Sequence, residues 1–189
     1  LWAVAVALSG GTVLHNEELE QLSPARRALL LDQLPPLGVI GRAVDFFEPY
    51  PSAVVADCAD GARYLALFNY SESMVDLHFS LADIGIEHAL VFDCHVRSFV
   101  GLVSEIDATN VNPHDALLYL LLPEPDAPAF LCASGDMFLG RMRLRSELYG
   151  DEISVCGSMR EGEKYYGYYP CGSVPSGVTG TPVGSGVIA

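Results

Sequence analysis

Residues 8–48 decide the fold, and they read LSGGTVLHNEELEQLSPARRALLLDQLPPLGVIGRAVDFFE. Ser23 and Pro24 predict the start of a helix, because serine caps free N–H groups and proline fits the first helical turn. Apolar residues form a wide stripe along residues 25–34, and a Pro-Pro pair ends the helix, since the residue before proline avoids helical angles. The chain is predicted to be helical before this break and to form strands after Arg42.

The segment before that helix predicts a short α/β piece. Residues 1–8 are apolar throughout and fit either a buried helix or a buried strand, and two glycines after them indicate a turn. Residues 12–14 (Thr-Val-Leu) are expected to form a small buried parallel strand, followed by a loop at His15 and Asn16. One and a half αβ units are too few to form a sheet alone.

After the Pro-Pro break the hydrophobic period changes to two, which is typical of strands. Residues 63–69 and 74–80 are expected to pair as a hairpin, and residues 89–94 and 98–103 as the next pair. Further strands are expected at residues 116–122, 128–132, 137–148, 153–159 and 164–169. The tail at residues 172–189 is expected either to add one or two edge strands or to be partly disordered.

Turn signals separate these runs, which is the pattern of an antiparallel β-sandwich. The predicted fold class is therefore mainly β, an antiparallel β-sandwich preceded by a short α/β piece. We expect two units, the α/β piece at residues 1–42 and the sandwich domain at residues 43–189.

Composition narrows the function classes. The net charge is −14, from 24 acidic and 10 basic residues, which argues against nucleic acid because phosphate binding needs clustered Lys and Arg. The same charge argues against an anionic membrane surface. It serves solubility, or it marks an acidic sugar-binding cleft. Half the residues are hydrophobic, yet no apolar run reaches the roughly 18 residues of a membrane span, so we expect a large core or a surface that packs on another part.

Five cysteines stand at wide spacings without a CxxC pair, so no zinc site is expected. Free thiols in a reducing, cytoplasmic compartment are the expectation. The tripeptide Asn69-Tyr70-Ser71 matches a glycosylation sequon by pattern only. Residue Leu1 begins inside an apolar stretch without a basic leader, and we expect the chain to be part of a longer one.

No catalytic constellation, metal site or cofactor site is expected from the residues. The five histidines form no HExxH or HxH motif. Cys94 and His95 are neighbours in a strand-like run, so their side chains point to opposite faces and make a poor nucleophilic dyad. The carboxylates of Glu17, Glu18 and Glu20 are either a solvated loop or candidates for a glycosidase pair.

A tyrosine cluster at residues 165–169 is the best binding-site candidate in the β part. In a strand, Tyr166 and Tyr168 share one face, where their rings could stack on a sugar. Tyrosines in strands are also ordinary packing residues. Both interpretations stay open at the level of sequence.

The order of these signals resembles the melibiase-type glycoside hydrolases, the α-galactosidase group. The resemblance rests on WAVAVALSGGTVL, then the Leu-Ser-Pro-x-Arg helix and Pro-Pro turn, and then three strand segments. These segments are ALFNYS (residues 66–71), VFDCHVRSFVG (91–101) and VNPHDALLYLL (111–121). It covers the chain to about Arg141. His95 departs from the pattern, because such domains often carry tryptophan at that position.

The resemblance implies the end of a (β/α)8 barrel joined to a C-terminal β-sandwich. The family's catalytic aspartates lie on earlier barrel strands, so none is assigned here and the chain is expected to be non-catalytic and structural by itself. The parent would be a retaining α-galactosidase-like enzyme. His15 and Asn16 follow the position of the last barrel strand and would line its pocket. The apolar face of the helix at residues 25–34 should then be incompletely covered.

The rival hypothesis is a carbohydrate-binding or interaction β-sandwich without hydrolase activity, and Tyr166 and Tyr168 are its candidate ligand contacts. A relative that acts on another sugar, or has lost activity, is a third. Carbohydrate is the expected partner of an intact enzyme, nucleic acid and membrane are not expected, and a homo-oligomer is possible.

Overall fold

The structure is a computed structural model, and it describes residues 1–11, 18, 20–150, 152–170 and 180–189. It is mainly β, and its sheets are antiparallel, as predicted. The helical elements are α1 (Trp2–Ala7), α2 (Pro24–Asp32) and the 3-10 helix η1 (Leu81–Ile84). The strands are β1 (Arg42–Ala43), β2 (Ala53–Asp57), β3 (Arg63–Asn69), β4 (Val75–Ser80), β5 (Ala89–Asp93), β6 (Ser98–Val103), β7 (Glu105–Val111), β8 (Asp115–Leu122), β9 (Ala129–Ala133), β10 (Leu144–Tyr149), β11 (Glu152–Gly157), β12 (Tyr165–Tyr168), β13 (Pro182–Gly184) and β14 (Val187–Ile188).

A six-stranded sheet forms the centre, with the strand order β1-β2-β3-β8-β5-β6. Its middle strands are buried on both faces, because successive side chains of a strand point to opposite sides. In β3, Leu65 and Leu67 enter one core, whereas Tyr64 and Phe68 enter the other. This double burial explains why these strands read as nearly continuous apolar runs.

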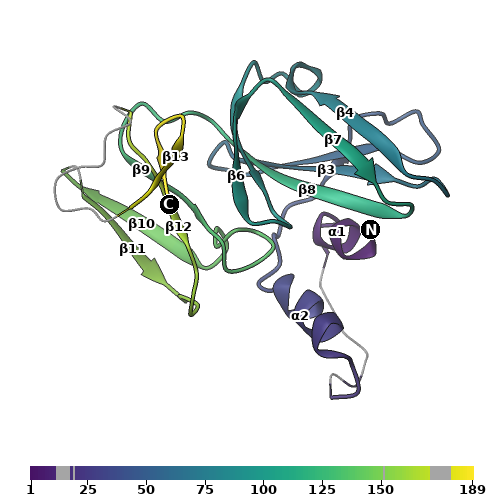
Figure 1. Cartoon of the computed structure of the whole chain (residues 1–189), viewed down its shortest axis with the longest axis horizontal. Helices are drawn as coiled ribbons and strands as arrows, with labels where there is room; N and C mark the ends of the chain where they lie inside the picture. Colours follow the sequence, from purple (N-terminus) through teal and green to yellow (C-terminus); the bar gives the residue numbers. More distant parts are fainter. Residues whose placement is uncertain (12–17, 19, 151, 171–179) are drawn as a thin grey trace.

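The first face of the central sheet is covered by the two-stranded sheet β4-β7 and by η1 (Figure 1). Phe79, Leu81 and Ile106 from this layer pack with Leu65 and Leu121 of the central sheet in one core. These two layers are the antiparallel sandwich that the alternating pattern predicts.

The second face is covered by α1 and by the part of the chain that follows β8. Val4 of α1 and Leu131 of β9 join Tyr64 and Leu118 in a second core. The Tyr64 hydroxyl donates a hydrogen bond of 2.8 Å to the carbonyl of Phe138, and the two rings meet edge to face. The central sheet and the C-terminal lobe therefore share one core.

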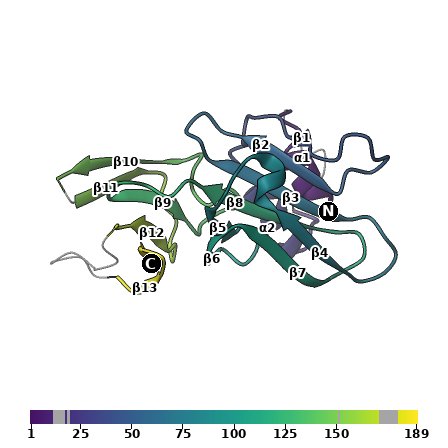
Figure 2. The ribbon, with the colours of Figure 1, turned by 90° about the horizontal axis from the view of Figure 1, so that it is seen from above.

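The C-terminal lobe consists of a four-stranded sheet, with the order β13-β14-β12-β9, and the hairpin β10-β11 (Figure 2). The hairpin projects from the lobe, and most of its side chains are exposed. Tyr168 pairs with Val187, so the end of the chain completes the sheet beside β12.

Two strand predictions are wrong. Residues 63–69 and 74–80 are both strands, but they do not pair with each other. Strand β3 pairs with β2 and β8, while β4 pairs with β7 in the opposite layer, so the turn between them crosses the sandwich. The expected long strand at residues 137–148 is broken, because Leu139 and Gly140 have positive φ angles that end strand geometry. Only β10 remains of it.

Two further expectations about local structure hold in the described residues. Residues 89–94 and 98–103 form the predicted hairpin β5-β6. The apolar start of the chain is the helix α1, one of its two alternatives. The strand expected at residues 12–14 lies outside the described residues. Over the described part of the chain, no helix has the length and apolarity to cross a lipid bilayer.

Helix α2 begins as predicted, with the Ser23 side chain accepting a hydrogen bond from the N–H of Arg26. None of its residues is buried, and Leu29 and Leu31 are 45% and 43% exposed. Figure 1 shows that α2 lies outside both layers and extends away from the sheets. The expectation of an incompletely covered helix face is confirmed.

Candidate functional site

The two candidate tyrosines of β12 lie in the core. Tyr166 and Tyr168 share a face, as predicted, and are 3% and 4% exposed. The Tyr166 ring packs edge to face on Phe92 at 5.2 Å, and its hydroxyl donates to the carbonyl of Arg97 at 3.0 Å. The Tyr168 hydroxyl donates to Glu124 Oε1 at 2.7 Å. Burial raises the pKa of both hydroxyls, and for Tyr168, whose hydroxyl also bonds Glu124, the pKa reaches about 12.

These positions favour the packing interpretation of the tyrosine cluster. A sugar stacks on an aromatic face that solvent can reach, and both rings are covered. Carbohydrate binding by Tyr166 and Tyr168 stays a prediction, and it would require movement of β12. A cavity of about 180 Å³ does lie beside Tyr165, Tyr166 and Tyr169, with Ile153 of the β10-β11 hairpin on its wall.

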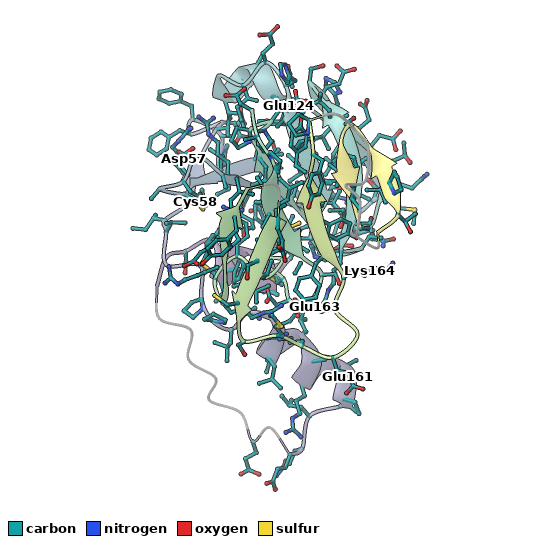
Figure 3. The ribbon with its side chains drawn as sticks, turned by 90° about the vertical axis from the view of Figure 1, so that its left-hand side faces the viewer. Asp57, Cys58, Glu124, Glu161, Glu163 and Lys164 are labelled. Atoms are coloured by element: carbon teal, nitrogen blue, oxygen red, sulfur yellow. The ribbon has the colours of Figure 1, made fainter. Side chains whose placement is uncertain are left out.

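A second hollow of about 520 Å³ lies where the Tyr168 hydroxyl reaches the surface. It is lined by His88, Glu124, Asp126, Tyr168 and three prolines. Among the described residues it shares no lining residue with the groove beside α2, and Figure 3 shows Glu124 in the upper part of the view and Glu163 well below it. This hollow is therefore separate from the groove beside α2 described below.

The remaining candidates from the sequence are only partly visible. His15, Asn16 and Glu17 lie outside the described residues. Glu18 is exposed and accepts a hydrogen bond from the Gln21 amide, and Glu20 is exposed as well. The described carboxylates of this segment are thus on the surface, as in the solvated-loop interpretation.

The turn after β5 is organised by Asp93. Its Oδ1 accepts hydrogen bonds from the N–H groups of His95 at 2.7 Å and Val96 at 2.8 Å. The strand-like run expected at these two residues is a turn over residues 94–97, in which Cys94 is buried at 2% exposure and His95 is exposed, and both residues line the groove beside α2. Burial raises the pKa of the Cys94 thiol well above its usual value, which keeps it protonated and unreactive.

Arg97 closes this turn in a conformation that is uncommon for a non-glycine residue, with φ of 59°. Three contacts hold it there. Tyr166 donates to its carbonyl, its Nη1 donates to the carbonyl of Ser134 at 3.1 Å, and its Nη2 lies 2.7 Å from Asp32 Oδ2. The core tyrosine thus fixes the backbone of an arginine whose guanidinium reaches α2.

Helix α2 is attached to the body through polar contacts at its C-terminal end. Besides the Arg97 pair, the Asp32 carbonyl accepts from the N–H of Met137 at 3.3 Å. Arg160 Nη1 donates to the Gly135 carbonyl at 2.6 Å and lies 3.9 Å from Asp32 Oδ1, and its Nη2 donates to the Leu34 carbonyl at 3.4 Å. Burial, opposed mainly by Arg97, raises the pKa of Asp32.

A groove of about 500 Å³ lies between α2 and this turn. One wall carries Ala25, Ala28 and Leu29 of α2, and the polar side chains around it are those of Asp32, His95, Arg97 and Arg160. The sequence analysis did not find this set, because its members are separated by up to 128 residues between Asp32 and Arg160.

A buried ionic cluster supports the loop that forms the far side of the groove. Arg143 Nε lies 2.5 Å from Asp136 Oδ2, and Arg143 also pairs with both oxygens of Glu163. The side chains of Asp136, Arg143 and Glu163 are at most 5% exposed. Asp136 Oδ1 also accepts from the N–H groups of Phe138 and Gly140, so the cluster holds the tight turn there.

No cluster of three or more His, Cys, Asp or Glu side chains that could hold a metal occurs within the described residues. The chain matches no protein-family model. A comparison with curated protein sequences gives no significant match either.

Solved structures with a similar fold are glycoside hydrolases. A putative α-N-acetylgalactosaminidase from Bacillus halodurans is 22% identical with a TM-score of 0.56, over 66% of this chain. A GH27 β-L-arabinopyranosidase from Geobacillus stearothermophilus is 21% identical with a TM-score of 0.57, also over 66% of this chain. α-Galactosidase I from Mortierella vinacea is 11% identical with a TM-score of 0.53, over 63%.

This chain spans only 30%, 30% and 34% of the lengths of those three enzymes. At these identities the likeness is one of fold. The sequence motifs indicated a melibiase-type enzyme, and the structures that share the fold include enzymes of that type. The chain therefore has the fold of one part of these glycoside hydrolases.

Proposed function

We propose that this chain is the non-catalytic β-sandwich part of a retaining α-galactosidase-like glycoside hydrolase, and that it serves to cover and stabilise a catalytic domain. The observation that carries this proposal is helix α2, which has an apolar side but no buried residue. The shared fold with part of three larger hydrolases supports it.

Other exposed apolar side chains support the same role. Trp2 of α1 is 80% exposed, and Phe46 and Phe47, in the loop before β2, are 77% and 98% exposed. That loop is not loosely built, because Asp45 accepts hydrogen bonds from the Ser52 backbone at 2.7 Å and from its hydroxyl at 2.8 Å. Large exposed apolar residues of this kind are typical of surfaces that bind another protein part.

On this proposal the parent cleaves a terminal α-galactoside with two carboxylates that a catalytic domain supplies. The chain itself should then have no hydrolase activity. This is tested with the purified 189-residue chain on 4-nitrophenyl α-galactoside, α-N-acetylgalactosaminide and β-L-arabinopyranoside, with an active α-galactosidase as the positive control. No release of nitrophenol is expected, and turnover by pure protein would overturn the proposal.

The role of the exposed surface is tested by the state of association. An uncovered apolar face should make the purified chain self-associate as its concentration rises, and Leu29→Glu should reduce this association without altering the fold. Arg26→Glu, a change on the same helix, is the matched control and should have a much smaller effect. A chain that stays monomeric at all concentrations would count against a covering role.

Carbohydrate binding by the sandwich is the second candidate, favoured by the cavity beside Tyr165 and Tyr166. Titration with galactose or raffinose tests it. Millimolar or tighter binding that is lost in Tyr165→Ala, whose ring is only partly buried, would favour this candidate. Tyr166→Ala and Tyr168→Ala complete the series, with circular dichroism to check folding.

We also propose a reducing, cytoplasmic compartment, because Cys58, Cys94, Cys132 and Cys156 are all free thiols. The division into units at residues 1–42 and 43–189 is retained as a proposal. Helix α1 packs in the core that the central sheet shares with the C-terminal lobe, whereas α2 stands outside it. A cut after residue 42 would therefore leave part of that core exposed.

A further inference from the structure

We propose that the groove between α2 and the turn at residues 93–97 is a binding site for a small organic carboxylate. The proposal rests on the groove's own donors, charge and shape, and does not depend on the proposed role in a glycoside hydrolase. The residues that would contact the ligand are His95, Arg97 and Arg160, with Leu29 and Met137 on the apolar side.

The groove contains hydrogen-bond donors that the described residues do not use. A guanidinium carries five N–H donors. Arg97 uses two of them, on Ser134 and Asp32, and Arg160 uses two, on Gly135 and Leu34. Three donors on each arginine therefore remain without a partner among the described residues. The arginine side chains are 36% and 39% exposed, so a ligand can reach them.

The charge of the groove is opposite to that of the chain. The chain carries 24 acidic and 10 basic residues. Among the described residues, however, the groove is lined by two arginines and a histidine against one carboxylate, that of Asp32. Asp32 is shared between the two arginines, and the nearby carboxylates of Asp136 and Glu163 are both paired with Arg143. An anion is therefore the ligand that this site favours, whereas a cation would find only one partner.

The shape of the groove selects an organic carboxylate among anions. Guanidinium groups bind a carboxylate through two parallel hydrogen bonds. The groove also has an apolar lining, formed by Ala25, Ala28 and Leu29 of α2 and by Met137, which is 3% exposed. A ligand with an anionic end and an apolar or ring-shaped body would contact both the arginines and the apolar lining. In the part of the chain that the structure describes, no Phe, Tyr or Trp ring lines the groove, so a neutral sugar would lack its usual stacking partner.

The site is also pre-organised. Arg97 has a positive φ, its carbonyl is bonded by Tyr166 from the core, and its guanidinium is bonded to Ser134 in the loop after β9. Backbone geometry of this kind persists when the surrounding structure fixes it, and it is common where a side chain must be held in place for a ligand. Asp93 in turn fixes the backbone of His95.

The test is isothermal titration of the whole chain with hexanoate, D-galacturonate, D-galactose and inorganic phosphate. Hexanoate represents aliphatic acids and galacturonate represents sugar acids, so the comparison shows which kind of carboxylate the groove prefers. We expect at least one of them to bind at millimolar or lower concentration. Galactose and phosphate should bind at least about tenfold more weakly, as expected for loss of a charge-assisted hydrogen bond or of the apolar contact.

Two variants locate the site. Arg160→Met keeps the aliphatic stem and should weaken carboxylate binding about tenfold. Arg145→Met removes an exposed arginine of β10 and should leave binding unchanged. His95→Ala should weaken carboxylate binding several-fold. Because His95 is exposed, this variant should fold normally, and it replaces Arg160→Met as the test if Arg160→Met does not fold.

Three outcomes would overturn the proposal. The first is no binding of either carboxylate at concentrations up to about 20 mM, which is weaker than a specific site provides. The second is equal binding of galactose or phosphate, which would remove the organic carboxylate as the ligand class. The third is an equal loss in Arg160→Met and Arg145→Met, which would place the ligand elsewhere.

Discussion

Arg97 reaches across from the β5-β6 turn to lie 2.7 Å from the carboxylate of Asp32, at the last residue of helix α2. This pair joins two segments that are 65 residues apart. Because α2 buries none of its own residues, its position depends on this contact and on the neighbouring Arg160 contacts. The exposed helix and the core of the sandwich are thereby coupled through one partly buried carboxylate.

The first prediction concerns the pH dependence of that carboxylate. The pKa of Asp32 is raised above 3.8, mainly by burial and against the effect of Arg97. A raised pKa means that the folded state binds the proton more tightly, so this group favours folding below pH 3.8 and loses that contribution as pH rises through the raised pKa. Arg160 and Asp136 also face Asp32, with opposite effects on it.

Asp32→Asn removes this titration. We compare the free energies of unfolding of Asp32→Asn and the wild type by urea unfolding at a series of pH values. The value for Asp32→Asn minus the value for the wild type should increase as the pH rises from below 3.8 to neutral. A difference between the two proteins that falls over this range, or does not change, would show that the Arg97 pair outweighs burial.

The second prediction concerns the buried ionic cluster. Arg143→Met would leave the carboxylates of Asp136 and Glu163 buried without their partner, and it should lower the free energy of unfolding by about 3–5 kcal/mol. Arg145→Met, at an exposed position two residues away, is the control and should change it by less than about 0.5 kcal/mol. Equal effects in chemical denaturation would contradict a structural role for the cluster.

The third prediction concerns the core that joins the sandwich to the C-terminal lobe. Phe92 is fully buried between Phe99 and Tyr166, with ring centroids at 5.1 and 5.2 Å. Phe92→Ala should cost about 3–5 kcal/mol, because it leaves a cavity in a close-packed core. Phe47→Ala, at a side chain that is 98% exposed, should cost less than about 0.5 kcal/mol. A mild effect of Phe92→Ala would mean that the two lobes are not packed as described.

The fourth prediction concerns His78, whose Nδ1 lies 2.7 Å from Asp107 Oδ1 across the β4-β7 sheet. This hydrogen bond raises the pKa of the imidazole above 6.5. The pair therefore favours folding fully below pH 6.5 and loses this effect as pH rises through the raised pKa. An NMR titration of the His78 ring should give a midpoint above 6.5 that falls in Asp107→Asn. An unchanged midpoint in that variant would exclude Asp107 as the cause.

The sequence alone predicted those helices and strands whose signals lie within the element or beside it in the chain. Ser23, Pro24 and the Pro-Pro pair define α2, and the alternating or continuous apolar runs define β3, β5 and β8. The incomplete burial of α2 was expected from the resemblance to melibiase-type enzymes, because in that resemblance the helix belongs to the end of a barrel whose other strands are not in this chain.

The errors of the sequence analysis arose where non-local contacts decide. Strands β3 and β4 are close in sequence but belong to opposite layers, which periodicity alone does not reveal. The break before β10 depends on Asp136, which accepts hydrogen bonds from the N–H groups of Phe138 and Gly140 and pairs with Arg143, a residue that also pairs with the distant Glu163. The groove at Asp32, Arg97 and Arg160 has no local signal at all.

The central claim is that this chain works as the non-catalytic sandwich of a larger glycoside hydrolase. The most direct measurement is mass spectrometry of the native protein, isolated with an antibody against this chain, together with an α-galactosidase assay of the isolate. We expect one polypeptide well above 20.3 kDa, with peptides continuous with this chain and with glycosidase activity. A native polypeptide of 20.3 kDa without hydrolase activity, and with no catalytic domain bound, would contradict the claim.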